Sequence, residues 1–333
     1  MDTQIGRRLR DIRTRLGVSQ RQLARVSDEI YIQTRRNRNV IWAPGRITLH
    51  FASIKNVTFP PPETANMAVG VPPNPIGSYA IDGFLPDKEA LWKYPAISDG
   101  WFRIHNTIRA EMGKFRAMLV RVSQETVMQD WQIDALKTYW KGHFAIVHSH
   151  HWHEENLFNP MLKERVELPA KIEKDHEQIL KLMNGVDDEV AKISSGAGST
   201  LQPVLKAFDK YAPDMKNHLT EEENICVPLM RAYFEPKPVG EKVEKIMKKM
   251  PKIEMGSFVH HQGSQAEFQK FMAQEGIPFF VWYLEFKKCR TMYREKMETL
   301  VQRVLTGVQP ANTSKKELAD AINFDPSMSW KVA

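Results

Sequence analysis

Two stretches of the sequence place histidine and glutamate four residues apart in the same pattern. The first is HHWHEENLFNPML, residues 150–162, and the second is HLTEEENICVPLM, residues 218–230. Aligned without a gap, they share five pairs: His150/His218, Glu154/Glu222, Glu155/Glu223, Asn156/Asn224 and Pro160/Pro228. Imidazole nitrogens and carboxylate oxygens are ligands for first-row metals such as iron, manganese or zinc. The repeat therefore suggests a metal site to which two segments contribute in a similar way.

Helical geometry predicts that the first pair faces a protein interior. Residues four apart on an α-helix differ by about 40° around the axis, so His150 and Glu154 share a face. That face also carries His143, and its other residues are apolar: Ile146, Val147, Leu157, Phe158 and Met161. Two neighbouring histidines, His151 and His153, flank this stripe, while His148, Trp152 and Glu155 point largely away from it.

Three other predicted helices place histidine on an apolar stripe in the same way. His218 and Glu222 lie on one such stripe, and His105 and His176 lie on two others. Burying four imidazoles and two carboxylates is costly unless the groups are paired or bind a metal. The set is too large for one tetrahedral zinc, but it suits a dinuclear site with bridging carboxylates, which helix bundles build from facing side chains.

The elements that must position these residues are predicted to be helical. Residues 101–234 are nearly free of proline and show strong helical periodicity, with breaks at residues 124–128, 168–169 and 194–200. The predicted helices span about 101–124, 129–165, 169–194 and 200–233. Such short connections favour an up-down-up-down arrangement. We therefore expect an all-α protein with an antiparallel four-helix bundle.

The rest of the chain differs in composition from this middle part. Residues 39–100 hold nine of the 20 prolines, which predicts an extended strap with short strands near 40–51. The C-terminal part is expected to add helices near 240–249 and 279–306. The predicted regions are an Arg-rich helical arm at 1–38, the proline-rich segment at 39–100, the metal-binding bundle at 101–234 and a helical extension at 235–333.

Composition limits the class of protein. The 333 residues are 42% hydrophobic and 26% charged, as in ordinary soluble globular proteins. No apolar run approaches the roughly 20 residues of a membrane span, and no secretory signal is recognisable. Two cysteines, Cys226 and Cys289, form no disulfide framework. We therefore expect a cytoplasmic protein without membrane contact, whose oligomeric state the sequence leaves open.

Other metal motifs fit these residues less well. A zincin needs H-E-x-x-H, but Leu157 stands three residues after Glu154. A ferritin-like site needs E-x-x-H on two helices; Glu173 and His176 supply one, whereas Met215 precedes His218 at that spacing. The histidine-rich stretch could alternatively be a solvated polar face. A further pair, His260-His261, has no carboxylate at helical spacing and is not expected to form an additional site.

Taken together, four motifs resemble the hemerythrin-like, or HHE cation-binding, domain family. They are HNTIRAE from His105, HHWHEENLFNPML from His150, EKDHEQI around His176 and HLTEEENICVPLM from His218. The resemblance covers about residues 101–234. It implies a bundle around a non-haem di-iron centre, with two irons joined by an oxo or hydroxo bridge. The implied metal ligands are His105, His150, Glu154, His176, His218 and Glu222, with the two glutamates bridging.

The third predicted helix departs from the family pattern. Oxygen-carrying hemerythrins place two histidines four apart there, but Ile172 and Leu180 stand four residues before and after His176. One ligand is therefore missing unless His151, Glu173 or Glu177 replaces it. The implied function is binding of oxygen, NO or iron, in sensing or storage, with a small diatomic ligand as partner. A di-iron oxidase that uses the open position is an alternative.

The N-terminal arm carries the other alternative. Residues 1–38 contribute +6 of the net charge of +7, and IGRRLRDIRTRLGVSQRQLARVS resembles the start of a lambda-repressor-type helix-turn-helix. The residues that should form the recognition helix do not continue the pattern, so nucleic-acid binding through this arm lacks its reading element. A solvated basic helix is the favoured interpretation, and a transit peptide is disfavoured by Asp2 and Asp11. A transcription regulator with a hemerythrin-like sensor domain is the alternative function.

Overall fold

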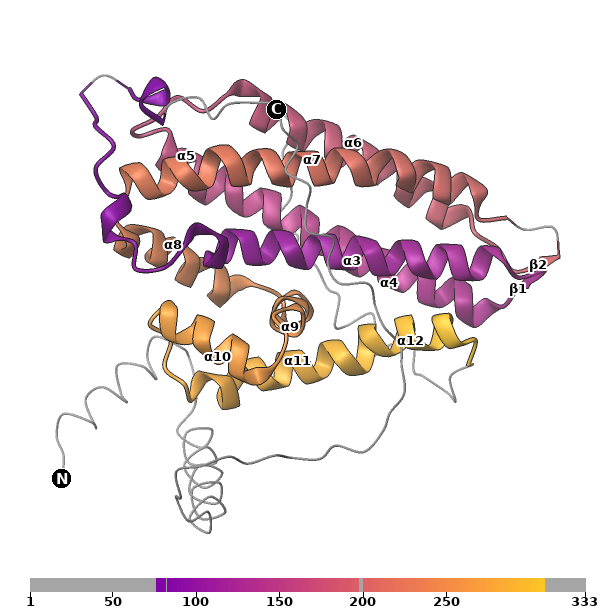
Figure 1. The fold of residues 1–333 in the computed structure, drawn as a ribbon. Coiled ribbons are helices and arrows are strands. Elements are labelled where there is room, and N and C mark those ends of the chain that lie inside the picture. Colours follow the sequence, from indigo (N-terminus) through magenta and orange to yellow (C-terminus); the bar gives the residue numbers. More distant parts are fainter. Residues whose placement is uncertain (1–75, 82, 198–199, 309–333) are drawn as a thin grey trace, which may run out of the picture. The chain divides into compact units, whose positions relative to one another are not determined.

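The computed structural model describes residues 76–81, 83–197 and 200–308, which belong to one compact unit of the chain. The predicted N-terminal arm, the strands expected near residues 40–51 and the last 25 residues lie outside this described part. Within it the protein is mostly helical, as the sequence predicts (Figure 1). Residues 76–98, expected to be extended, contain three short 3-10 turns: Ile76–Tyr79, Glu89–Leu91 and Ala96–Ser98.

Four long helices pack side by side and form the centre of the described fold (Figure 1). Helix α3 packs against α4 and α7, and α6 packs against the same two helices. Three of the four begin and end within two residues of the predicted limits. The four helices are α3 (Gly100–Ser123), α4 (Asp130–His153), α6 (Ala170–Lys192) and α7 (Gln202–Tyr233).

Local sequence signals explain where these helices start. The carboxylate of Asp99 accepts a hydrogen bond from the N–H of Trp101 and so caps α3. Gln129 and Gln132 form a reciprocal capping box at the start of α4. The two loops at one end are joined by short antiparallel strands, β1 (Val127–Met128) and β2 (Gly196–Ala197). Gly196 has a φ of 106°, which glycine adopts without a steric penalty.

The second predicted helix is interrupted. We predicted one helix over about 129–165, but α4 ends at His153 and is followed by a π-helical turn, Glu154–Phe158, and by α5, Asn159–Leu162. Pro160 lies in α5, and the matching proline of the second motif, Pro228, lies inside α7 without an interruption. Proline alone therefore does not explain the π turn. Such turns are frequent at functional sites, and this one begins at a predicted metal ligand.

The C-terminal helices are more numerous than the sequence suggested. Two of them, α9 and α10, escaped prediction because they are short. The long predicted helix spans 282–306 and contains two π turns, Trp282–Phe286 and Arg294–Glu298. Among the described residues, no helix has the length and apolar character needed to cross a membrane. The remaining helices are α8 (Pro236–Lys249), α9 (Lys252–His261), α10 (Gln265–Gln274), α11 (Lys287–Tyr293) and α12 (Thr299–Thr306).

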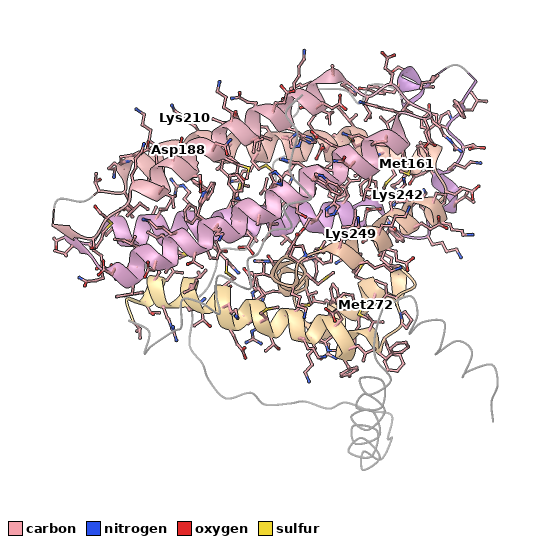
Figure 2. The ribbon with its side chains drawn as sticks, turned by 180° about the vertical axis from the view of Figure 1, so that it is seen from behind. Met161, Asp188, Lys210, Lys242, Lys249 and Met272 are labelled. Atoms are coloured by element: carbon pink, nitrogen blue, oxygen red, sulfur yellow. The ribbon has the colours of Figure 1, made fainter. Side chains whose placement is uncertain are left out.

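These C-terminal helices are packed onto the α3/α4 side of the long helices (Figure 1). The aromatic stretch at 279–286 contributes Trp282 and Phe286 to an apolar cluster with α9 and α10, as expected for a packing role. Phe279 stays largely exposed. The opposite surface is polar, with Asp188 of α6 and Lys210 of α7 exposed to solvent (Figure 2).

Two apolar layers of the core enclose a polar layer. On α3, Trp101 belongs to one apolar cluster and Ile108 to the other, with His105 between them. On α7, Leu219 and Cys226 belong to the two clusters in the same way. All predicted metal-ligand positions fall in the polar layer. The apolar layers shield it from water, which strengthens electrostatic interactions within it.

A separate buried network joins the C-terminal helices to the long helices. The Glu111 carboxylate of α3 accepts hydrogen bonds from the hydroxyls of Tyr139 in α4 and Ser257 in α9. The Nδ1 atom of His261 lies 3.9 Å from the same carboxylate. Burial opposes ionisation of Glu111, but His261, Lys114 and the two donated hydrogen bonds outweigh it and lower the pKa of Glu111.

Replacing Glu111 with leucine should destabilise the protein by about 2–4 kcal/mol, because Tyr139 and Ser257 lose a charged acceptor while staying buried. Glu125→Leu, which breaks a half-exposed ion pair with Arg121, should cost less than about 1 kcal/mol. Urea unfolding measures both. Since the pKa of Glu111 is lowered in the folded state, its contribution is complete above the ordinary pKa of 4.5 and is lost as the pH falls further. Equal costs for the two variants would contradict a stabilising network.

Candidate metal centre

The structure brings all six sequence-predicted residues together in the polar layer, from four different helical segments. They are His105 of α3, His150 and Glu154 around the end of α4, His176 of α6, and His218 and Glu222 of α7. Every one of these side chains is buried. The buried histidines and glutamates fit a metal site.

The ligand atoms fall into two overlapping sets. The first set consists of His151, Glu154, His176 and His218, and the second of His105, His150, Glu154 and Glu222. Within each set, all ligand atoms lie within 4.8 Å of one another. Glu154 belongs to both sets. We call these the His176 set and the His105 set.

The separations between neighbouring ligand atoms suit a shared metal better than direct hydrogen bonds. Two atoms that are each about 2.1 Å from one metal lie roughly 3.0–3.5 Å apart. In the His105 set, Nε2 of His150 is 3.2 Å from Oε1 of Glu154, and Nε2 of His105 is 3.5 Å from Oε2 of Glu222. In the neighbouring set, Nε2 of His176 is 3.6 Å from Oε2 of Glu154.

Glu222 lies between the two sets. Its Oε1 atom is 3.4 Å from Nε2 of His176, and its Oε2 atom is 3.5 Å from Nε2 of both His105 and His218. Glu222 belongs to the His105 set, yet its two oxygens also lie close to His176 and His218 of the other set. Glu154 likewise lies close to histidines of both sets. The two glutamates occupy equivalent positions in the repeated motif, which agrees with their similar placement.

Several of these atoms lack a hydrogen bond from any described residue. They include Nε2 of His105, His150 and His218, and both carboxylate oxygens of Glu154 and Glu222. Leaving a buried polar atom without a partner costs about 1–3 kcal/mol, more when the group is charged. So many unsatisfied ligand atoms around one centre fit metal binding, which would satisfy them all at once.

His151, which flanks the apolar stripe of His150, belongs to one of the two ligand sets. It is fully buried, and its ring stacks on that of His176 with centroids 4.3 Å apart. The helical wheel was centred on His150, which places His151 about 100° away. His150 belongs to one ligand set and His151 to the other. The consecutive histidines were the sequence signal for this role.

The third predicted helix supplies one histidine, His176, to the ligand sets. Of the three candidates for the missing ligand, only His151 lies in a ligand set. Glu173 is exposed and pairs with Lys163, and Glu177 is also exposed. The His176 set thus has three imidazoles, whereas the His105 set has two.

The second glutamate of each motif has a separate role. Glu155 accepts a hydrogen bond from Nδ1 of His176 at 2.9 Å, and Glu223 contacts Nδ1 of His105 at 3.0 Å. Each contact directs the Nε2 atom of that imidazole toward the ligand sets, as partners of metal-binding histidines commonly do. Arg109 in turn holds Glu223 with two hydrogen bonds. The duplicated Glu-Glu pair therefore combines an inward carboxylate with one that orients a histidine on another helix.

The electrostatics keep most of these imidazoles neutral. Burial lowers the pKa of His150 and His151 well below the ordinary value, and lowers that of His218 to about 4. Burial acts in the same direction on His176, but Glu155 and Glu222 outweigh it and raise its pKa to about 9. Neutral imidazole is the form that binds metal, and a cation bound at His176 would displace its second proton.

The two inward carboxylates differ in the metal-free protein. Burial and the neighbouring Glu222 charge raise the pKa of Glu154. Burial also opposes ionisation of Glu222, but His218, His176 and His105 outweigh it and lower its pKa. The pKa values of the two carboxyl groups are therefore shifted in opposite directions. A bound cation would favour the ionised form of both.

The His260-His261 pair lies in the separate Glu111 network. His260 has Nε2 3.5 Å from Glu298, and His261 faces Glu111. Carboxylates from other helices thus face this pair, an arrangement that spacing along α9 does not reveal. Neither histidine belongs to a ligand set.

Comparison with known families supports the metal centre. Residues 96–230 match the family model described as the hemerythrin HHE cation binding domain. No curated protein and no solved structure matches the chain. The matched residues include both ligand sets and the helical segments that carry them. The chain therefore contains a hemerythrin HHE cation-binding domain at residues 96–230.

Proposed function

We propose that the region 101–234 is an antiparallel four-helix bundle of the hemerythrin type that binds two iron ions. The observation that supports this most strongly is the pair of overlapping ligand sets that share Glu154. One set alone could hold a single metal ion. Two sets with a common carboxylate suit two ions that are bridged, as in other di-iron carboxylate bundles.

In this proposal, each residue has a definite role. His151, His176 and His218 would hold one iron, and His105 and His150 would hold the other. Glu154 and Glu222 would contribute carboxylate oxygens to both. When bound, the iron pair supplies an exchangeable position for a small ligand such as oxygen or NO. The His105 set has one imidazole fewer than the His176 set, so we assign the exchangeable position to it.

The surrounding residues would determine how the centre behaves. Glu155 and Glu223 hold two of the imidazoles in orientation, which fixes the spacing of both sets. Trp101 and Phe158, with ring centroids 4.9 Å apart, cover the end of the centre beside His105 and Glu154. Such an apolar cover limits access of water to the metal and favours reversible binding of a neutral diatomic molecule over hydrolysis or proton leakage.

The function that follows is binding of oxygen, NO or iron itself, in sensing or storage. An oxidase would use the same exchangeable position, and a transcription regulator would need residues 1–38, which lie outside the described part. Both alternatives stay predictions, as do a cytoplasmic location and the domain limits at residues 38, 100 and 234.

The protein purified without oxygen should contain about two irons per chain, because two ligand sets of comparable composition are available. Elemental analysis gives the metal content, and the optical spectrum after exposure to air reports a bridged ferric pair. A single tightly held zinc and no iron, even after iron is supplied during expression, would contradict the proposal.

A further inference from the structure

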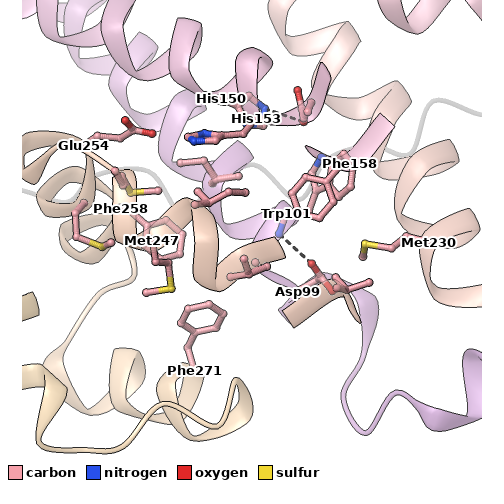
Figure 3. Close-up of a pocket in the computed structure, with 18 residues that line it drawn as sticks. Asp99, Trp101, His150, His153, Phe158, Met230, Met247, Glu254, Phe258 and Phe271 are labelled. Atoms are coloured by element: carbon pink, nitrogen blue, oxygen red, sulfur yellow. Dashed lines mark hydrogen bonds and ion pairs between the residues drawn. The ribbon is translucent and has the colours of Figure 1, made fainter. Parts of the chain in front are cut away.

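A cavity of about 100 Å³ adjoins the His105 set, and the proposed function does not account for it. His150 and Glu154 form part of its lining, so the cavity reaches the metal centre on the side that has only two imidazoles. Figure 3 shows Trp101 and Phe158 on one side of this space and Met247, Phe258 and Phe271 on the other.

Half of the lining residues come from outside the matched family domain. Helix α8 supplies apolar side chains, with Val239, Val243 and Ile246 among them. Helices α9 and α10 add Phe258 and Phe271. The cavity is therefore a property of this chain's C-terminal extension and does not belong to the four long helices alone.

Helix α8 covers the cavity loosely. Val239 is its only fully buried residue, while the other lining side chains of α8 are half-buried. The opposite face carries Lys245 and Lys248, which are exposed to solvent. A helix held by one half-buried apolar stripe can move aside at modest cost, which gives a ligand a route into the cavity.

Most of the lining is apolar. Apart from Asp99 and two members of the His105 set, His150 and Glu154, it contains two polar side chains, Glu254 and His153. The carboxyl group of Glu254 is directed toward the ring of His153 at the inner end of the cavity (Figure 3). Glu254 is only 3% exposed, and burial raises its pKa to about 8, so it is largely a neutral hydrogen-bond donor at pH 7. Nε2 of His153 is buried and accepts no hydrogen bond from a described residue.

We propose that this cavity is a binding site for a small, mainly apolar organic molecule with one neutral hydrogen-bonding group, held beside the His105 set with its polar group at Glu254 and His153. The size agrees with such a ligand, because an apolar cavity of about 150 Å³ binds benzene. A carboxylate ligand is disfavoured, since Glu154 and Glu222 are close by. The site goes beyond the proposed metal function and does not depend on which metal is bound.

Straight-chain alcohols from ethanol to 1-pentanol are suitable probes, with binding measured by saturation-transfer NMR on the full-length protein as purified. Each added methylene should raise affinity about fourfold until the cavity is filled. The matched probe 1,5-pentanediol should bind at least tenfold more weakly than 1-pentanol, because its second hydroxyl has no partner in the apolar lining. Affinity that is independent of chain length would overturn the proposal.

Three variants locate the binding. Val243→Trp fills the cavity from α8 and should abolish 1-pentanol binding, whereas Lys245→Trp, on the exposed face of the same helix, should leave it unchanged. Glu254→Leu removes the hydrogen-bonding group and should weaken 1-pentanol binding about fivefold. Unchanged binding by Val243→Trp, with its melting temperature and metal content like those of Lys245→Trp, would place the alcohol elsewhere and refute the site.

Metal analysis of the same samples separates this inference from the proposed function. Chain-length-dependent alcohol binding in a protein that lacks iron would support the cavity and contradict the di-iron proposal. Two bound irons without alcohol binding would support the di-iron proposal and contradict the cavity.

Discussion

Replacing Glu154 with alanine should empty both metal positions, whereas replacing His105 or His176 should empty only one. Glu154 is the residue common to both ligand sets, and its two oxygens face different histidines. Removing it deletes one donor from each set and leaves the imidazoles around an enlarged space. His105 and His176 each belong to a single set. We therefore expect iron to fall from about two per chain to near zero for Glu154→Ala, and to about one for each histidine variant.

The matched control for these variants is His148→Ala. His148 is also buried and lies on the same helix, but its ring stacks on Phe144 and belongs to neither ligand set. It should keep nearly all the iron. The measurement is elemental analysis after removal of loosely bound metal with a chelator, together with circular dichroism to verify the helical content. Equal losses for His148→Ala and His105→Ala would mean that the histidine-rich stretch binds metal without regard to direction.

The two irons should respond differently to azide. His151→Leu removes one of three imidazoles from the His176 set, so we expect metal loss there while the His105 set is preserved. His105→Leu removes one of only two imidazoles from the other set, to which we assign the exchangeable position. The His151 variant should therefore still bind azide, whereas the His105 variant should bind it at least tenfold more weakly or not at all.

An azide titration monitored by the optical spectrum tests this, with the iron content of each variant determined in parallel. The content should be about one iron per chain in both variants, so that a difference in azide binding reflects which position is occupied. Azide binding that survives in His105→Leu but disappears in His151→Leu would reverse the assignment. If His151→Leu keeps both irons and an unchanged spectrum, His151 is a packing residue and the third helix lacks its second ligand.

The sequence alone determined the limits of three of the long helices and selected six candidate metal ligands. Apolar stripes with a period of 3.6 residues predicted α3, α6 and α7 within two residues of their limits. The same stripes selected His105, His176 and His218 as inward-facing, because an ionisable residue in an apolar stripe is too costly without a function. These conclusions depend on local geometry, in which the spacing along one helix decides which face a side chain occupies.

Tertiary structure decided the features that depend on contacts between helices. His151 joins a ligand set because its ring lies beside those of His176 and His218 on two other helices, and a wheel drawn for one helix contains no information on such neighbours. Glu155 and Glu223 point away from the apolar stripes of their own helices, yet each orients a histidine on another helix. The cavity beside His150 exists only because α8, α9 and α10 are folded over that end of the centre. Spacing along the chain specified the inward ligands, whereas the partners that orient them and the space beside them depend on distances between segments far apart in sequence.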